Sequence, residues 1–260
     1  MTRVGVSFHP ALAPWLEQAP PEVQCVEILA ERFFGDARAL ANVLCARHPL
    51  IVRTELLSLA SPAWDASVVA PIAAFAAETQ ALWITDHLGF RFADGLDLGK
   101  PCPTSLNRHT LERVAARARD VMSACGTRLL IRNVASPLAV AGGIPEPEFL
   151  SRLCELTGCE LSLDLCALVV NARNHRFDSH EWLAAIDTRR IAHLHVGGCR
   201  QVDGRFDDTH DAPVTEDDWR LIEGVLRAHA PDVITLQWEA RFPPTCVITC
   251  ELLRLKALTA

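Results

Sequence analysis

Imidazole and carboxylate side chains recur at positions where they could bind a metal ion. The segment FDDTHDAPV places Asp208 and His210 two residues apart, so both could reach one ion from a single short loop. Carboxylate oxygens combined with imidazole nitrogens suit Fe, Mn or Zn. His87, Asp164 and His195 follow apolar runs elsewhere and complete the set of candidate metal ligands. The candidate catalytic residues are Asp164, His195, Asp208 and His210.

A second set of polar residues could contact a substrate. Arg132 lies within the apolar run RLLIRNVAS, where a buried charge destabilises the fold unless it is paired with an opposite charge. Arg132 could pair with buried carboxylates, clamp an anionic group of a substrate together with Arg53, or reach the surface and form one exposed ion pair. The candidate substrate-contacting residues are Arg53, Arg132, Asn133, Cys166 and Gln237.

Short apolar runs alternate with helical patterns along the whole chain. Fully apolar strands that alternate with helices predict a parallel sheet covered on both faces. Eight such units predict one (β/α)8 barrel, a TIM barrel, over residues 1–260, with a doubly wound open sheet as the alternative. The predicted strands are 4–8, 25–30, 50–55, 81–88, 128–135, 160–169, 191–198 and 233–240. Apolar residues at helical spacing predict helices over 37–47, 68–80, 110–126, 145–158 and 215–230.

The barrel prediction indicates where the polar residues should meet. In this architecture the functional side chains lie at the carboxyl ends of the strands and in the loops that follow them. Polar residues stand at those ends: His9, Glu27, Glu31, Arg53, Glu55, Asp86, His87, Arg132, Asn133, Asp164, Cys166, His193, His195, Gln237 and Glu239. Any one of them alone could be a hydrogen-bonded strand-end residue. Together they predict a polar mouth at one end of the barrel.

Composition excludes several classes of partner. The formal net charge is -7 and no block of Lys and Arg occurs, so the chain offers no electrostatic footprint for nucleic acid or an anionic membrane. MTRVGVSFHP has no signal-peptide pattern, and no apolar run approaches the roughly 18 residues of a membrane span. The ten cysteines are scattered without a CxxC pair, which indicates reduced thiols. We therefore expect a cytoplasmic protein.

A series of ordered motifs resembles a known family. GVSFHP, VEILAERFFG, ITDHLGF, the segment from RNVAS through SLDL to VVNARNHRFD, HLHVGG, DDTHDAPV and QWEARFPP follow one another between about residues 4 and 244. They resemble the multinuclear non-haem iron oxygenases typified by the methanobactin-biosynthesis oxidase. The resemblance implies a (β/α)8 barrel with two or three irons at its mouth. It also implies oxidation of cysteine-containing peptides with O2, and a small partner protein that presents the peptide's leader.

The resemblance also indicates site residues. It implies metal ligands at His87 in TDHL, Asp164 in SLDL, His195 in HLHVGG, and Asp208 and His210 in DDTH. Four positions depart from the family pattern. Arg53 stands in place of a His, Arg132 of a Glu, Cys166 of an Asn and Gln237 of a Glu. Each change removes a ligand, and two install a permanent cation, so at most one Fe(II) is expected.

Three functions follow from this degenerate ligand set. The first is an enzyme with one Fe(II) that oxidises a cysteine-containing peptide or a small thiol. The second is a metal-free relative that binds a peptide or pairs with an active oxygenase, with Arg53 and Arg132 supplying the charge of the missing metal. The third is a divalent-metal isomerase or hydrolase of the sugar-isomerase kind, supported only by the shared architecture.

Overall fold

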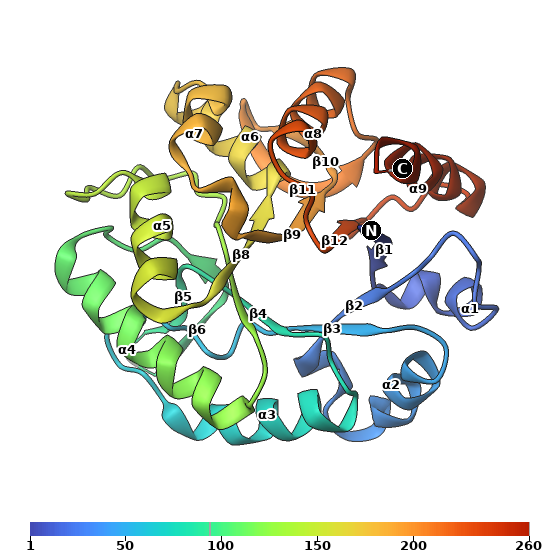
Figure 1. Ribbon diagram of the computed structural model, residues 1–260, viewed down its shortest axis with the longest axis horizontal. Coiled ribbons are helices and arrows are strands. Elements are labelled where there is room, and N and C mark those ends of the chain that lie inside the picture. The colour runs from blue at the N-terminus through green and yellow to red at the C-terminus, as the bar shows by residue number, and fades with distance from the viewer. Residues whose placement is uncertain (94, 260) are drawn as a thin grey trace.

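Eight parallel strands close into a barrel in the computed structural model, which describes residues 1–93 and 95–259 (Figure 1). The strand order is β1-β12-β9-β8-β7-β4-β3-β2, and β1 pairs with both β2 and β12. This closure confirms the barrel and excludes the open sheet. The strands are β1 (Arg3–Ser7), β2 (Val26–Leu29), β3 (Leu50–Arg53), β4 (Ile84–His87), β7 (Leu129–Arg132), β8 (Glu160–Asp164), β9 (Ile191–Val196) and β12 (Val233–Leu236).

Helices surround the barrel, and the first and last elements lie side by side (Figure 1). The helices are α1 (Ala13–Leu16), α2 (Arg38–Cys45), α3 (Val69–Glu78), α4 (Arg108–Cys125), α5 (Glu146–Thr157), α6 (Leu165–His175), α7 (Ser179–Ala185), α8 (Glu216–Ala228) and α9 (Thr245–Leu258). Local sequence sets their ends. Thr215 and Asp218 form a capping box at α8, and Gly158 ends α5 in the left-handed conformation. No helix of the described ranges is long and apolar enough to cross a membrane.

The predicted strand 160–169 is too long. β8 ends at Asp164, and the apolar residues after it begin α6. The Asp164 side chain accepts a hydrogen bond from the Ala167 amide, which is an N-cap interaction that starts the helix. Because both the strand and the first turns of α6 are buried, the apolar run carries no periodicity that marks the boundary. Cys166 therefore lies in the first turn of a helix and not at a strand end.

Two β-hairpins that the sequence did not predict stand over the carboxyl ends of the strands. β5 (Phe90–Ala93) pairs with β6 (Leu96–Cys102), and β10 (Gly198–Val202) pairs with β11 (Arg205–Ala212). The segment FDDTHDAPV, predicted as a loop, is mostly strand β11. It is rich in Asp and partly exposed, so it lacks the apolar alternation of a core strand. As residues of one strand separated by two, Asp208 and His210 share a face.

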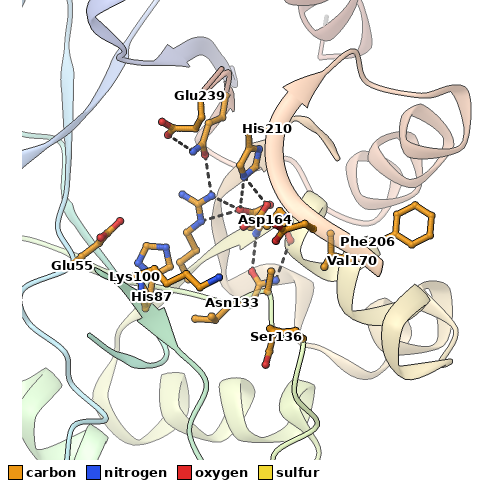
Figure 2. Close-up of a pocket in the computed structure, with 18 of the residues that line it drawn as sticks. Glu55, His87, Lys100, Asn133, Ser136, Asp164, Val170, Phe206, His210 and Glu239 are labelled. Carbon is orange, nitrogen blue, oxygen red and sulfur yellow. Dashed lines mark hydrogen bonds and ion pairs between the residues drawn. The ribbon is translucent and has the colours of Figure 1, made fainter. Parts of the chain in front are cut away.

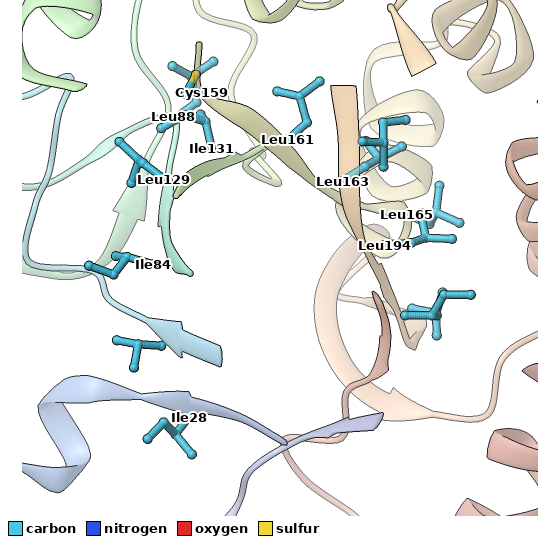
Figure 3. Packing of buried hydrophobic residues seen from close by; sticks show 14 of the residues in the cluster. Ile28, Ile84, Leu88, Leu129, Ile131, Cys159, Leu161, Leu163, Leu165 and Leu194 are labelled. Carbon is cyan, nitrogen blue, oxygen red and sulfur yellow. The ribbon is translucent and has the colours of Figure 1, made fainter. Parts of the chain in front are cut away.

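Alternation along the strands separates an apolar floor from a polar mouth inside the barrel. A buried cluster consists of Cys25, Ile51, Trp83, Leu130, Ala192 and Val233. Two residues after five of these stand Glu27, Arg53, Thr85, Arg132 and Thr235. The strand period of two places both layers on one face. Side chains on the opposite face, including Ile28, Ile131 and Leu194, pack in the layer between the strands and the helices (Figure 3).

Strand register brings distant residues together at the mouth. His87 on β4 is opposite Arg132 on β7, and Asp164 on β8 is opposite His195 on β9. Neighbours in a parallel pair project their side chains to the same face. The barrel therefore places four candidate residues around one opening.

Candidate functional site at the barrel mouth

A cavity of about 210 Å³ opens at the carboxyl ends of the strands. It is lined by Arg53, Glu55, His87, Lys100, Pro101, Arg132, Asn133, Val134, Ala135, Ser136, Pro137, Asp164, Val170, Phe206, Asp207, Asp208, His210, Gln237 and Glu239. Figure 2 shows His210 directed toward Asp164, with His87 and Glu55 on the other side of the opening. Most of the candidate residues named from the sequence line this cavity, whereas His195 lies beneath it, wholly buried.

Arg132 crosses the centre of the site. Its guanidinium donates two hydrogen bonds to Asp164 Oδ2, and Nη2 also donates to Gln237 Oε1 at 3.0 Å. The residue is 2% exposed, so the alternative of an exposed ion pair is wrong. Burial opposes its charge, but Asp164 and Glu27 keep the pKa above its ordinary value. Arg132 thus faces a buried carboxylate in the position where the resemblance implies a metal ligand.

Asp164 is held firmly by its neighbours. Asn133 accepts a hydrogen bond from the Asp164 amide at 2.7 Å and donates one to its carbonyl at 3.0 Å. Oδ1 caps α6, which leaves Oδ2 to face Arg132 and the cavity. Burial alone would raise the pKa of Asp164, but Arg132 and His210 hold it well below its usual value. Asp164 is therefore an ionised carboxylate in a fixed orientation.

Asp208 and His210 point at a common position. Asp208 Oδ1 and His210 Nε2 are 2.8 Å apart, and His210 Nε2 is 3.6 Å from Asp164 Oδ2. Neither imidazole nitrogen has a hydrogen-bond partner among the described residues, because these contacts lack the required alignment. The Cys166 sulfur lies within 4.8 Å of both side chains' ligand atoms. Donors that converge in this way could hold a metal ion, and without one Asp208 and His210 form an ion pair.

The backbone of His210 is strained to reach this position. Its φ is 41°, in the left-handed region that residues other than glycine rarely adopt. Gly197, directly after β9, leaves the space that the imidazole occupies, since a Cβ there would lie 2.4 Å from Nδ1. The second glycine of HVGG has a separate reason, because a Cβ at Gly198 would meet the Ala212 carbonyl oxygen at 2.1 Å. The two glycines of HVGG are therefore required by the close approach of the His210 ring and of the hairpin backbone, respectively.

The pKa of His210 makes the stability of the metal-free protein depend on pH. Burial alone would lower this pKa, but Asp208 and Asp164 raise it to about 10. Because folding raises it from an unfolded value of about 6.5, the stabilisation is complete below pH 6.5 and is lost as the pH rises through 10. We expect urea unfolding of chelator-treated protein to give lower stability at pH 10 than at pH 6.5. The decrease should be smaller in His210→Gln, and an equal decrease in both proteins would contradict this assignment.

His195 belongs to a different pair from His210. Its Nε2 lies 2.8 Å from Glu27 Oε2 and 3.5 Å from Arg132 Nη1. Glu27 is fully buried and also accepts a hydrogen bond from Ser7 at 2.8 Å. Glu27, His193 and His195 form a second group with convergent ligand atoms, but the His193 nitrogens already contact the Ser162 and Thr235 hydroxyls. The sequence indicates Glu27 only as a strand-end residue without a role, because its partner becomes evident only when the barrel closes.

The remaining predicted residues have distinct positions. His87 lines the cavity apart from the Asp208 and His210 group, and burial, Arg132 and Arg53 hold its pKa well below the usual value, so it is neutral. The Gln237 amide links Arg132 to Glu239, to which Nε2 donates at 2.7 Å. The Cys166 thiol lies beside the Cys199 thiol, which together with burial raises the pKa of Cys166. Cys166 is therefore a protonated thiol and not a ready nucleophile.

The mouth fits one metal ion but not a cluster. Cys166, Asp208 and His210 have ligand atoms within 4.8 Å of one another, and Asp164 Oδ2, which Arg132 contacts, lies 3.6 Å from His210 Nε2. Such thiolate, carboxylate and imidazole donors are suited to Fe(II) or Zn(II). The guanidinium of Arg132 lies beside this set, on Asp164, and that of Arg53 lies elsewhere in the mouth, among Glu27, Glu55 and Glu239, so a second or third cation at the mouth would be repelled. The structure thus agrees with a single ion and disagrees with the two or three that the resemblance implies.

We expect Gly197→Ala to weaken metal binding by roughly 10- to 100-fold, because the new methyl group must displace the His210 ring. The measurement is a titration of the anaerobic protein with Mn(II), followed by electron paramagnetic resonance of the free ion. Gly224→Ala is the matched control, since a Cβ there, within α8, meets nothing closer than 4.0 Å. Unchanged affinity in a folded Gly197→Ala protein would contradict the role given to His210.

The closed parallel barrel and its mouth of carboxylates, imidazoles and arginines define a TIM barrel with a polar site in the usual position for this architecture. Within that class, the chain belongs to the RiPP precursor modification enzyme family MbnB/TglH/ChrH, which matches residues 3–260. It is similar to a UPF0276 protein of Rhizorhabdus wittichii, with 30% identity over 238 residues that cover 90% of this chain and 86% of the relative. A UPF0276 protein of Bordetella pertussis is 31% identical over 268 residues, which cover 99% of this chain and 93% of the relative.

Solved structures confirm the architecture alone. D-psicose 3-epimerase of Clostridium cellulolyticum superposes with a TM-score of 0.62 and 15% identity, covering 96% of this chain and 90% of the epimerase. Endonuclease IV of Thermus thermophilus gives a TM-score of 0.59 and 19% identity, with 98% of each chain covered. These proteins share the barrel and carry different activities, so the likeness does not extend to function.

Proposed function

We propose that the protein oxidises a cysteine-containing precursor peptide, or a small thiol, at one Fe(II) ion held by Asp164, Asp208 and His210. The observation that carries the proposal is the convergence of Asp208 Oδ1 and His210 Nε2, which lie 2.8 Å apart, with the Cys166 sulfur within 4.8 Å of both. Membership of a family that modifies RiPP precursors supports a peptide as the substrate. A small partner protein that presents the leader of the peptide belongs to the same proposal.

Several residues around the cavity have a defined role in this proposal. Asn133 and the first turn of α6 fix Asp164, and Gly197 and the hairpin fix His210. Arg132 offsets the charge of Asp164 and keeps it ionised. An Fe(II) ion bound here would supply open positions for O2 and for a substrate thiolate. The substrate would enter the cavity between the two hairpins, past Lys100 on β6 and Phe206 on β11.

A spectroscopic experiment tests whether a thiol reaches the metal. Co(II) is bound to a Cys166→Ser variant, which removes the protein's own thiol from the site. Addition of N-acetylcysteine amide is expected to produce a thiolate-to-cobalt charge-transfer band, whereas N-acetylserine amide should produce none. Asp208→Ala should abolish the band. The proposal fails if Co(II) binds and neither this thiol nor a synthetic cysteine-containing peptide changes its spectrum.

The ion pair between Arg132 and Asp164 favours a second candidate function. Without metal, Arg132 neutralises Asp164, and a protonated His210 neutralises Asp208. The charges of these four side chains would then balance without a metal ion, and the protein would act as a metal-free peptide-binding subunit. In that case chelator would leave the thermal unfolding temperature unchanged, whereas a metal that binds only the folded state stabilises it.

A further inference from the structure

A second hollow adjoins the mouth cavity. It has a volume of about 190 Å³, and Val134 and Ser136, in the loop between β7 and α5, line both hollows. This loop is therefore the rim between them. We call the second hollow the side groove, and its apolar walls are Leu88, Leu106, Val134, Leu138, Val140 and Phe177.

The side groove presents apolar side chains that the core of the protein does not use. Leu138 is 65% exposed and Val140 is 43% exposed, although both lie beside a polar site. Glu146 also lines the groove, but its carboxylate accepts a hydrogen bond from the Trp182 indole at 3.2 Å. Exposed apolar side chains that gather around a hollow are typical of a binding site.

Hydrogen bonds hold the rim in place without a ligand. Asn171 on α6 accepts a hydrogen bond from the Ser136 amide at 2.8 Å and donates one to the Val134 carbonyl oxygen at 2.9 Å. His175 Nε2 lies 2.8 Å from the Ser136 carbonyl oxygen. Farther along the loop, the Gly143 amide donates to the Leu106 carbonyl oxygen at 3.0 Å. A ligand would therefore meet a formed groove and would spend little binding energy on ordering it.

We infer that the side groove binds an apolar side chain of the substrate peptide, close in sequence to the cysteine whose thiol enters the mouth. The inference rests on the proposed function, because it takes a cysteine-containing peptide as the substrate. Two hollows that share one rim can be occupied by neighbouring residues of one extended peptide. The size of the groove suits a single side chain, since pockets for whole small-molecule ligands usually measure about 300–1,000 Å³. Leu138 and Val140 are then specificity-determining residues.

Short peptides test this inference. The probes are heptapeptides with a central cysteine in a background of serine, and a leucine replaces each serine in turn. Their affinities for the anaerobic protein loaded with Co(II) are measured by titration calorimetry. We expect at least one leucine position to increase the affinity roughly 10-fold over the serine background, which corresponds to burial of most of a leucine side chain.

Substitutions locate the leucine in the side groove. The double variant Leu138→Ser with Val140→Ser should lose most of the increase, and the fold should tolerate it because both side chains are exposed. Ala139→Phe should also lose the increase, since the larger side chain fills the groove. Leu253→Ser is the matched control, because Leu253 is 50% exposed on α9, outside both hollows, and its removal should change nothing.

The cobalt spectrum separates the failure of this inference from the failure of the proposed function. A thiolate-to-cobalt band without any effect of leucine would overturn the inference and leave the proposed function standing. An effect of leucine that persists when serine replaces the central cysteine, with no thiolate band, would support the groove and contradict the proposed function. An equal increase in the wild type and in the double variant would overturn the inference, because the leucine would then bind elsewhere.

Discussion

Replacing His210 with alanine is expected to abolish stabilisation of the protein by metal. In the wild type, Fe(II) at about one hundred times its dissociation constant should raise the free energy of unfolding by about 2.7 kcal/mol. His210→Ala removes the donor that lies 2.8 Å from Asp208 and 3.6 Å from Asp164, so no comparable gain should remain. Urea unfolding under anaerobic conditions, with and without Fe(II), provides the measurement.

The control for this prediction is His180→Ala. His180 is an exposed residue of α7, outside the cavity, and its removal should leave the full metal-dependent gain. A His210→Ala protein that keeps the gain would show that the metal binds elsewhere, for example at Glu27 and His195. Loss of the gain in both variants would point to nonspecific binding by histidines.

The largest effect on stability is expected from Arg132→Met. This substitution leaves Asp164 as a buried carboxylate without its cation, and breaking a buried pair in this way costs about 3–5 kcal/mol. The metal-free protein should show the full loss in urea unfolding. Adding Asp164→Asn should restore part of the stability, because asparagine removes the unpaired charge and still caps α6.

The pair of Arg189 and Asp187 is a matched comparison for Arg132→Met. The Arg189 side chain is 83% exposed, and its ion pair is expected to contribute about 0–1 kcal/mol. Arg189→Met should therefore change the free energy of unfolding little. Similar small losses in Arg132→Met and Arg189→Met would contradict the assignment of Arg132 as the buried partner of Asp164.

The strands of the barrel could be predicted from the sequence because each is a short apolar run between helical segments. The boundary between β8 and α6 could not, since both sides are buried and equally apolar. The hairpin of β10 and β11 was also missed, because a partly exposed strand rich in aspartate resembles a loop. The pattern of apolar residues indicates which side chains are buried. The boundary between β8 and α6 and the hairpin of β10 and β11 are instead defined by backbone hydrogen bonds.

The composition of the mouth could be predicted, but its pairings could not. Strand ends and the loop after the seventh strand indicated that Asp164, His195 and His210 would lie near one another, and a buried carboxylate was one of three alternatives for the partner of Arg132. The division between them depends on which atoms face each other after closure: His195 turns to Glu27, whereas His210 reaches Asp164 from the hairpin. The cluster around Arg53 arises from three different strand ends and has no local sequence signal.

The central claim is that this mouth holds one metal ion beside two arginines. The most direct test is the iron content of wild-type protein purified without oxygen, offered Fe(II) and freed of excess, measured by mass spectrometry. The expected result is about one iron per chain, lost on treatment with chelator. No bound iron would support the metal-free function, and two or three irons per chain would contradict the place given to Arg53 and Arg132.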